Sequence, residues 1–180
     1  MRAYVTSVGE KTTDICVTQL KKFGFDVVLL DHKEKWIEKY KRFINIADED
    51  CIRVDADIIL NSNIIDPLKY TQGLSNWLMC QFKVYDIYKN NIHLGIPVMY
   101  KKEALGIIRR NFDKVNPLRP EATAWRIPEI NPHTFNIDEV VGIHGIYQDA
   151  DTVRRAMKNK IDRKQFSDYD FELIEKLMNL

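Results

Sequence analysis

Residues 51–60 form an apolar run, Cys-Ile-Arg-Val-Asp-Ala-Asp-Ile-Ile-Leu, which one arginine and two aspartates interrupt. The apolar residues before the aspartates favour a buried strand, so Asp55 and Asp57 stand at the end of a core element. Carboxylates without partners cost several kcal/mol in such surroundings, which indicates a cation or a strong hydrogen-bond network beside them. Because side chains alternate along a strand, we expect both carboxylates to point to the same side.

The aspartate pair suits a hard divalent cation. Carboxylate-only ligation with open positions is typical of Mg²⁺ or Mn²⁺ that holds a phosphate group, whereas Zn²⁺ prefers nitrogen and sulfur ligands. A simpler alternative makes Asp55 and Asp57 a polar strand end that caps the next helix, since aspartate is common in turns. The surrounding pattern favours a ligand site, because open α/β sheets bind ligands at the carboxyl ends of their strands.

The first third of the chain alternates between apolar strands and amphipathic helices. Residues 3–9 are expected to form a strand that ends in a turn of small residues, followed by a helix that ends at Gly24. Residues 25–30 form a near-continuous apolar strand, which implies a parallel sheet covered on both faces. A helix over 33–46 then leads to the strand that carries the aspartates. This order predicts an α/β fold with an open, mostly parallel twisted sheet flanked by helices.

The rest of the chain shows a different pattern. Alternating polar and apolar residues around the turn signal Asn90-Asn91 predict a hairpin or an adjacent antiparallel strand pair over 77–100. The other expected elements are helices near 64–70 and 103–111, a proline-rich surface loop over 117–132, a strand at 140–145, and helices at 152–164 and 167–179.

The composition is ordinary for a globular protein, with 45% hydrophobic and 29% charged residues. A net charge of +1 and the absence of interleaved basic and aromatic residues argue against nucleic acid as a partner. The three cysteines lie far apart, each beside apolar residues, so we expect reduced core thiols. No apolar run approaches the roughly 18 residues of a membrane span and no signal region is visible, so we expect a cytoplasmic protein.

The segment 53–57, the small-residue turn after the first strand and Asp31 after the second strand together resemble the nucleotide-sugar-dependent glycosyltransferases of the GT-A fold. The hallmark of that family is an Asp-x-Asp motif, which residues 55–57 match. Residues 95–105 are similar to a family segment in which a glycine-led strand meets a helix that begins with two basic residues, Glu, Ala and Leu. His144, between glycines in Gly-Ile-His-Gly, resembles the late histidine that supplies a further metal ligand in many members.

The resemblance implies transfer of a sugar from a nucleoside-diphosphate sugar to an unknown acceptor (a glycan, a lipid or a protein), with Mn²⁺ or Mg²⁺ as cofactor. Asp57 would bind the ion directly, Asp55 would reach the ribose or the ion, and His144 would complete the metal site. Further implied nucleotide-binding residues lie after the first two strands: Thr6, Ser7, Gly9 and Asp31. The expected organisation is one domain, 1–180, with a nucleotide-binding half (1–60), an acceptor and metal half (61–147) and C-terminal helices (148–180).

A catalytic base is harder to place. Inverting members carry a pair of acids after the strand that begins near Gly95, and this chain has no clear pair there. Glu121, in the proline-rich segment, is the best candidate for the base, and the simpler alternative is a solvated loop acid. Simpler alternatives also exist for His144, as a strand-end histidine that binds nothing, and for Asp31, as a helix cap.

The first turn argues against two other nucleotide-binding folds. It has one glycine, whereas the Rossmann fingerprint needs three, and Gly9-Glu10-Lys11-Thr12 lacks the first glycine of a P-loop. A sugar-phosphate nucleotidyltransferase stays open, although the turn lacks the glycine- and basic-rich loop of that class. A non-catalytic nucleotide-sugar-binding or assembly module also stays open. The final helix predicts a packing or homo-oligomer contact through an apolar stripe, formed by Phe171, Ile174, Leu177 and Met178.

Overall fold

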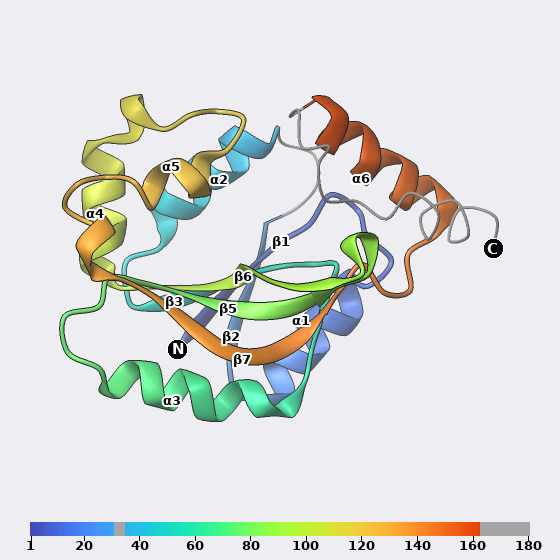
Figure 1. Cartoon of the computed structure of the whole chain (residues 1–180), viewed down its shortest axis with the longest axis horizontal. Helices are drawn as coiled ribbons and strands as arrows, with labels where there is room; N and C mark the ends of the chain where they lie inside the picture. The colour runs from blue at the N-terminus through green and yellow to red at the C-terminus, as the bar shows by residue number, and fades with distance from the viewer. Residues whose placement is uncertain (31–34, 163–180) are drawn as a thin grey trace.

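The computed structural model describes residues 1–30 and 35–162, and in them one seven-stranded sheet carries helices on both faces (Figure 1). The strands are β1 (Arg2–Thr6), β2 (Asp26–Leu30), β3 (Cys51–Asp55), β4 (Ile58–Leu60), β5 (Met79–Asp86), β6 (Asn91–Tyr100) and β7 (Thr134–His144). Within these residues the strand order is β2-β1-β3-β6-β5-β7-β4, and only β6 and β4 run against the common direction. The expected α/β fold, an open and mostly parallel sheet with an antiparallel strand, is confirmed.

Helices cover the sheet from two sides. In the described part of the chain they are α1 (Thr13–Lys22), α2 (Trp36–Ile46), α3 (Ile65–Gly73), α4 (Lys102–Arg110), α5 (Pro120–Ala124) and α6 (Ala150–Asp162). In Figure 1, α1 and α3 lie below the sheet, and α2, α4 and α5 lie above it. Because strand side chains point alternately to the two faces, each helical layer has its own core.

The lower core joins β1 and β3 to α1 and α3, through Ala3, Val5, Ile52, Val54, Cys16, Leu20 and Leu68. The upper core joins the intervening residues of the same strands to α2 and α4, through Tyr4, Cys51, Tyr40, Phe43, Leu105 and Ile108. Arg53 lies between Ile52 and Val54, so strand alternation sends its side chain toward the upper layer. A fully buried arginine thus enters a largely apolar core.

The proline-rich segment 117–132 differs from the surface loop that the sequence predicts. Pro120 occupies the first turn of α5, where its missing N–H leaves no helical hydrogen bond unmade, and later residues of the segment are buried in the upper core. β7 also begins earlier than the strand expected at 140–145. Its first residues pair in parallel with Met79–Phe82 of β5, and this long-range pairing extends the strand back to Thr134.

The three cysteines are buried and form no disulfide, in agreement with the expected core thiols. None of the helices in residues 1–30 and 35–162 combines the length and the apolar character that crossing a bilayer requires. The expected helix at 167–179, and with it the predicted oligomer contact, lies outside the described residues. The division into halves at residues 60 and 147 stays a prediction.

The chain follows an unusual path between β3 and β4. Only Ala56 and Asp57 separate these two strands, yet β4 lies at the far edge of the sheet, beside β7. The carboxyl ends of β1, β3, β5 and β7 meet at the end of the sheet to which this connection belongs, and β6 begins there. Polar side chains from all these strands gather at this end.

Candidate metal and nucleotide site

Asp55 ends β3 beside the end of β1. Thr6 is its register partner in β1, and the Thr6 hydroxyl donates a short hydrogen bond to Asp55 Oδ1. Arg53 Nη1 lies 3.2 Å from the same oxygen. The Asp55 side chain keeps 31% of its surface exposed, so its carboxylate is held in place and still faces solvent. This arrangement fits the predicted contact with a ribose, which stays a prediction.

Arg53 is a fully buried cation beside Asp55. Its Nη2 lies 2.8 Å from Glu121 Oε1, and its guanidinium lies over the Trp36 and Tyr40 rings, at 5.1 and 5.9 Å from their centroids. Burial alone would lower the pKa of the guanidinium, but Glu121 and Asp55 outweigh burial and raise the pKa above its usual range. Arg53 therefore ties the end of β3 to α2 and α5 as a permanent charge.

Glu121 lies in the first turn of α5 and is not a solvated loop acid. Its side chain is 19% exposed and forms the ion pair with Arg53. This ion pair could not be predicted from local sequence patterns, because the two residues stand 68 positions apart. The assignment of Glu121 as a catalytic base stays a prediction, and its contact with Arg53 gives it a structural role in addition.

Asp57 lies in the turn after β3, which corrects the expectation that it shares a strand face with Asp55. Its Oδ2 lies 3.0 Å from His144 Nε2, and its backbone carbonyl accepts a hydrogen bond of 2.9 Å from the Gly145 N–H. The pairing of β4 with β7, in which Ile58 opposes His144, holds the two residues together. The structure thus brings together Asp57 and His144, as the family resemblance implies, while Asp55 contacts Thr6 and Arg53.

His144 also faces Asp86, a residue that sequence reasoning missed. His144 Nδ1 lies 3.0 Å from Asp86 Oδ2, which is an ionic contact rather than an aligned hydrogen bond. Burial would lower the pKa of His144, but Asp57 and Asp86 outweigh burial and raise it to about 10. Without a metal, the ring is therefore a cation between two carboxylates. The hairpin turn expected at Asn90-Asn91 is the sequence feature that could have led to Asp86, since the turn places Asp86 opposite the start of β6.

The first turn holds the other predicted nucleotide-binding residues. Ser7 Oγ donates to Glu10 Oε2 at 2.8 Å and accepts from the Gly9 N–H at 3.0 Å. The Val8 N–H donates to the same Glu10 oxygen at 2.7 Å. Burial and the negative charge of Asp57 raise the pKa of Glu10. The turn is thus closed by its own carboxylate, and contact of Thr6, Ser7 and Gly9 with a nucleotide stays a prediction. Asp31 lies outside the described residues.

Two glycines of β7 and its end allow close packing beside His144. A Cβ atom at Gly142 would lie 2.7 Å from the Ile59 carbonyl oxygen of β4. Gly145 has a φ of +86°, and a Cβ atom there would lie 2.7 Å from the Tyr88 ring. The Tyr88 ring meets the His144 ring edge-on, with centroids 5.5 Å apart. These contacts fix the position of the imidazole relative to Asp57.

Gly145→Ala is therefore expected to lower the free energy of unfolding by about 1–3 kcal/mol, because it adds both a strained φ and a clash with buried Tyr88. Urea denaturation followed by circular dichroism measures the change. Gly73→Ala is the matched control, since no atom lies within 4 Å of a Cβ atom there and Gly73 ends a helix. Equal loss of stability in both variants would contradict this account of Gly145.

Comparisons with known proteins bear on the fold. No family model matches the sequence, and no curated protein matches it. Among solved structures, the chain is similar to A197 from STIV, with a TM-score of 0.55 and 15% identity, over 81% of this chain and 86% of that one. It is also similar to 4-diphosphocytidyl-2C-methyl-D-erythritol synthase from Anaerococcus prevotii DSM 20548, with a TM-score of 0.54 and 6% identity, over 82% and 89% of the two chains. The fold is GT-A-like.

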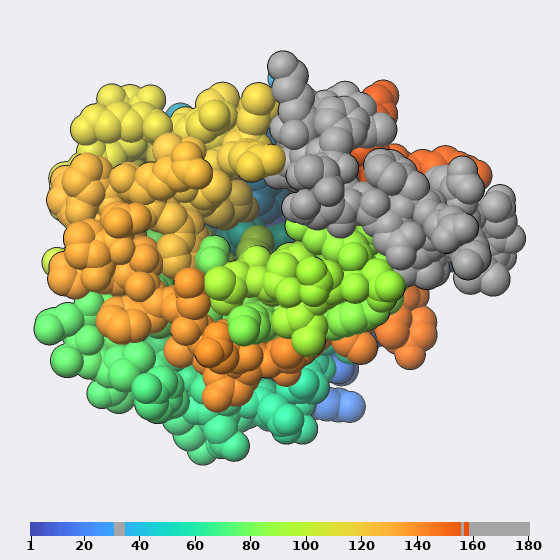
Figure 2. Space-filling view, in the orientation of Figure 1, coloured from blue at the N-terminus to red at the C-terminus, as the bar shows by residue number. Residues whose placement is uncertain are grey.

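The surface of the molecule is hollowed on the face that Figure 2 shows. Figure 2 shows a hollow between the segment that follows α4, in yellow to orange, and the green hairpin of β5 and β6. Of the two strands of this hairpin, β5 carries Asp86 and β6 carries His93. The hairpin turns at the carboxyl end of β5, and open α/β sheets bind their ligands at the carboxyl ends of their strands.

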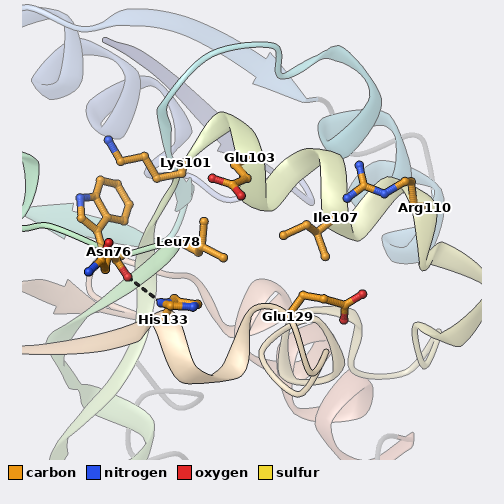
Figure 3. A pocket seen from close by; sticks show the side chains of 9 residues that line it. Asn76, Leu78, Lys101, Glu103, Ile107, Arg110, Glu129 and His133 are labelled. Atoms are coloured by element: carbon orange, nitrogen blue, oxygen red, sulfur yellow. Dashed lines mark hydrogen bonds between the residues drawn. The ribbon is translucent and has the colours of Figure 1, made fainter.

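A second cavity, of about 670 Å³, lies at the opposite end of β5 (Figure 3). Trp77, Lys101, Arg110 and His133 line it together with Glu103, so its charges are mixed. Lys101 Nζ is bound to Asp50 at 2.8 Å and lies 4.7 Å from the Trp77 ring centroid. The residues that the sequence predicts for metal and nucleotide binding are at the other end of the sheet, so this cavity is not the predicted site.

Proposed function

We propose that the chain is a metal-dependent transferase that binds a nucleoside-diphosphate sugar and passes the sugar to an acceptor. The observation that carries the proposal is the 3.0 Å contact of Asp57 with His144 at the carboxyl end of a GT-A-like sheet. One carboxylate and one imidazole on rigid neighbouring elements fit a divalent ion, and the imidazole favours Mn²⁺ over Mg²⁺. When bound, the ion supplies a Lewis acid for the charge that develops on the leaving diphosphate.

The chain's own residues would divide the work around the donor. Asp57 and His144 would hold the ion, and Asp55, oriented by Thr6 and Arg53, would accept hydrogen bonds from the ribose. The first turn would line the nucleoside. The negative charge of Glu10 in this turn would repel a phosphate placed there. This supports a binding mode with the diphosphate toward His144 and the nucleoside toward Ser7.

A nucleotidyltransferase is the second candidate, and one observation favours it. The TM-score with a 4-diphosphocytidyl-2C-methyl-D-erythritol synthase, 0.54, is nearly equal to the 0.55 with A197 from STIV. A third candidate, a binding module without catalysis, is favoured by the ion pair that joins Glu121 to Arg53. Incubation with nucleoside-diphosphate sugars, or with nucleoside triphosphates and sugar phosphates, separates the three. Release of a nucleoside diphosphate identifies a sugar transferase, and release of pyrophosphate identifies a nucleotidyltransferase. Release of neither product identifies a binding module.

Asp57→Asn is expected to weaken donor binding in Mn²⁺ by tenfold or more, or ~1.4 kcal/mol per tenfold, because the amide keeps the size and removes the ligand charge. Titration calorimetry with uridine and guanosine diphosphate, with and without a chelator, measures the effect. Asp66→Asn, an exposed position on α3, is the control and should bind as the wild type does. If neither the chelator nor the substitution changes the affinity, the metal-dependent donor site is ruled out.

A further inference from the structure

Three strands place a second set of metal-ligating side chains next to Asp57. Asp86 ends β5, His93 lies in β6 and His144 ends β7, and one potential ligand atom of each lies within 4.8 Å of the others. We infer that Asp86, His93 and His144 form a binding site for a borderline divalent transition metal, for which Zn²⁺ is the appropriate probe. The inference does not depend on donor binding, because it concerns the metal alone.

The donor set identifies the class of metal. Two imidazole nitrogens and one carboxylate oxygen are the ligands of catalytic zinc and of related transition-metal sites, whereas Mg²⁺ and Ca²⁺ prefer oxygen alone. Asp86 is almost fully buried, while the side chains of His144 and His93 are 15% and 28% exposed. The imidazoles therefore leave a path from solvent and room for a further, non-protein ligand.

The distances suit a metal-free form of such a site. Asp86 Oδ2 lies 2.9 Å from His93 Nε2 and 3.0 Å from His144 Nδ1. Around a four-coordinate Zn²⁺, with bonds of about 2.0–2.1 Å, ligand atoms lie about 3.3 Å apart. Asp86 therefore needs to move only a few tenths of an ångström away from each histidine to admit the ion, and the ligand atoms of the two histidines lie within 4.8 Å of each other. Side-chain rotation can supply such a shift without moving the strands.

Each ligand has an outer partner that orients it. His93 Nδ1 lies 2.9 Å from the Leu94 carbonyl oxygen, to which it donates, and Nε2 is turned to Asp86 Oδ2, so a metal would replace the proton on Nε2. His144 Nε2 faces Asp57 Oδ2 at 3.0 Å, so its Nδ1 is the atom directed to the metal. The other oxygen of Asp86 accepts a hydrogen bond of 2.8 Å from the Tyr88 N–H. Carboxylate and carbonyl partners of this kind accompany metal-bound histidines and raise their basicity.

The strand register makes the cluster rigid. In the hairpin, Asp86 pairs with Asn91 and Val84 pairs with His93, and in the β5–β7 pair Asp86 lies opposite His144. Three adjacent strands thus present their ligands at one end of the sheet. The role of Asp57 differs between this site and the proposed donor site. Here it is the hydrogen-bond acceptor behind His144, whereas in the donor site it is a ligand.

This difference gives a test that uses the full chain without nucleotide. After chelator treatment and dialysis, calorimetry with Zn²⁺ alone is expected to show one ion per chain with a dissociation constant in the micromolar range or below. His93→Ala should weaken Zn²⁺ binding by about 100-fold, and Asp57→Asn by about tenfold, since it removes an outer partner only. His133→Ala is the control, because His133 lines the other cavity, and it should bind as the wild type does.

Co²⁺ provides a second readout, because its visible absorption reports the number of ligands. The wild type should show an intense four-coordinate spectrum that His93→Ala loses, and His93→Asn serves as a second variant if the alanine form does not fold. Zn²⁺ affinity equal to the wild type in a folded His93 variant would overturn the inference. So would a wild type that binds Zn²⁺ no better than Mg²⁺. Manganese-supported nucleotide binding, measured separately, should be unchanged in His93→Ala. A failure of the zinc-site proposal can therefore be distinguished from a failure of the proposed donor site.

Discussion

Arg53→Met is expected to lower the free energy of unfolding by about 3 kcal/mol or more. Removing one member of a buried ion pair leaves the other charges without compensation, which costs about 3–5 kcal/mol in other proteins. The lower end applies here, because the side chains of Asp55 and Glu121 keep 31% and 19% of their surface in contact with solvent. The methionine side chain fits the space of the arginine stem, so a cavity adds little to the loss.

Urea denaturation of Arg53→Met beside Arg126→Met measures this loss, since Arg126 is exposed and its replacement should change stability little. Adding Glu121→Gln to Arg53→Met should recover part of the stability, because it removes one of the two carboxylates that lost the charge of Arg53. A single variant that unfolds at the wild-type urea concentration would show that Arg53 does not join β3 to α5. Arg53→Met should also weaken donor binding, through the loss of the cation that orients Asp55.

Raising the pH is expected to destabilise the metal-free protein through His144. The folded state keeps the His144 proton up to a pKa of about 10, whereas the unfolded chain releases it near about 6.5. The stabilisation is therefore fully present below about pH 6.5 and is lost as the pH rises toward 10, by an amount on the order of 5 kcal/mol. The groups that face the ring and set this shift are Asp57 and Asp86, with Tyr88 against its edge.

His144→Asn isolates this contribution from other groups that titrate at alkaline pH. In a chelator, the difference in unfolding free energy between wild type and His144→Asn should be largest at pH 6 and should shrink steadily toward pH 10. His133→Asn is the control, because His133 is half-buried, lies at the other end of β5 and contacts a backbone carbonyl, and it should leave the wild-type profile in place. A difference that stays constant from pH 6 to pH 10 would mean that the folded protein holds the His144 proton no more tightly than the unfolded chain does.

The sequence predicted what depends on local periodicity. The first three strands, the helices between them and the hairpin follow from apolar spacing and turn residues, and the structure confirms them. The pairing of Asp57 with His144 could be expected only from the family resemblance, since 87 positions separate the two residues. Asp86 and His93 were missed because each, alone, is an ordinary polar residue of a strand. Their chemistry appears only when the register of β5, β6 and β7 is known.

The aspartate pair shows where periodicity misleads. The sequence predicts that the strand beginning at residue 51 carries both aspartates at its end, and alternation then places Asp55 and Asp57 on the same side. The apolar residues after Asp57 in fact belong to β4, which pairs with β7 rather than extending β3. The buried ion pair of Arg53 could not be predicted either, because a single arginine in an apolar run gives no indication of distant partners such as Glu121.

The two-residue connection between β3 and β4 also limits the shape of the whole sheet. Four strand spacings separate these strands in the hydrogen-bonded order, which amounts to about 19 Å across a flat sheet. The chain from Asp55 to Ile58 can span at most about 11 Å, even fully extended. The sheet must therefore curl until its far edge approaches β3, and Asp55 and Asp57 lie at the point of closure. The short connection through Asp55 and Asp57 thus limits how far the sheet can flatten, so the residues of the predicted metal site also constrain sheet curvature.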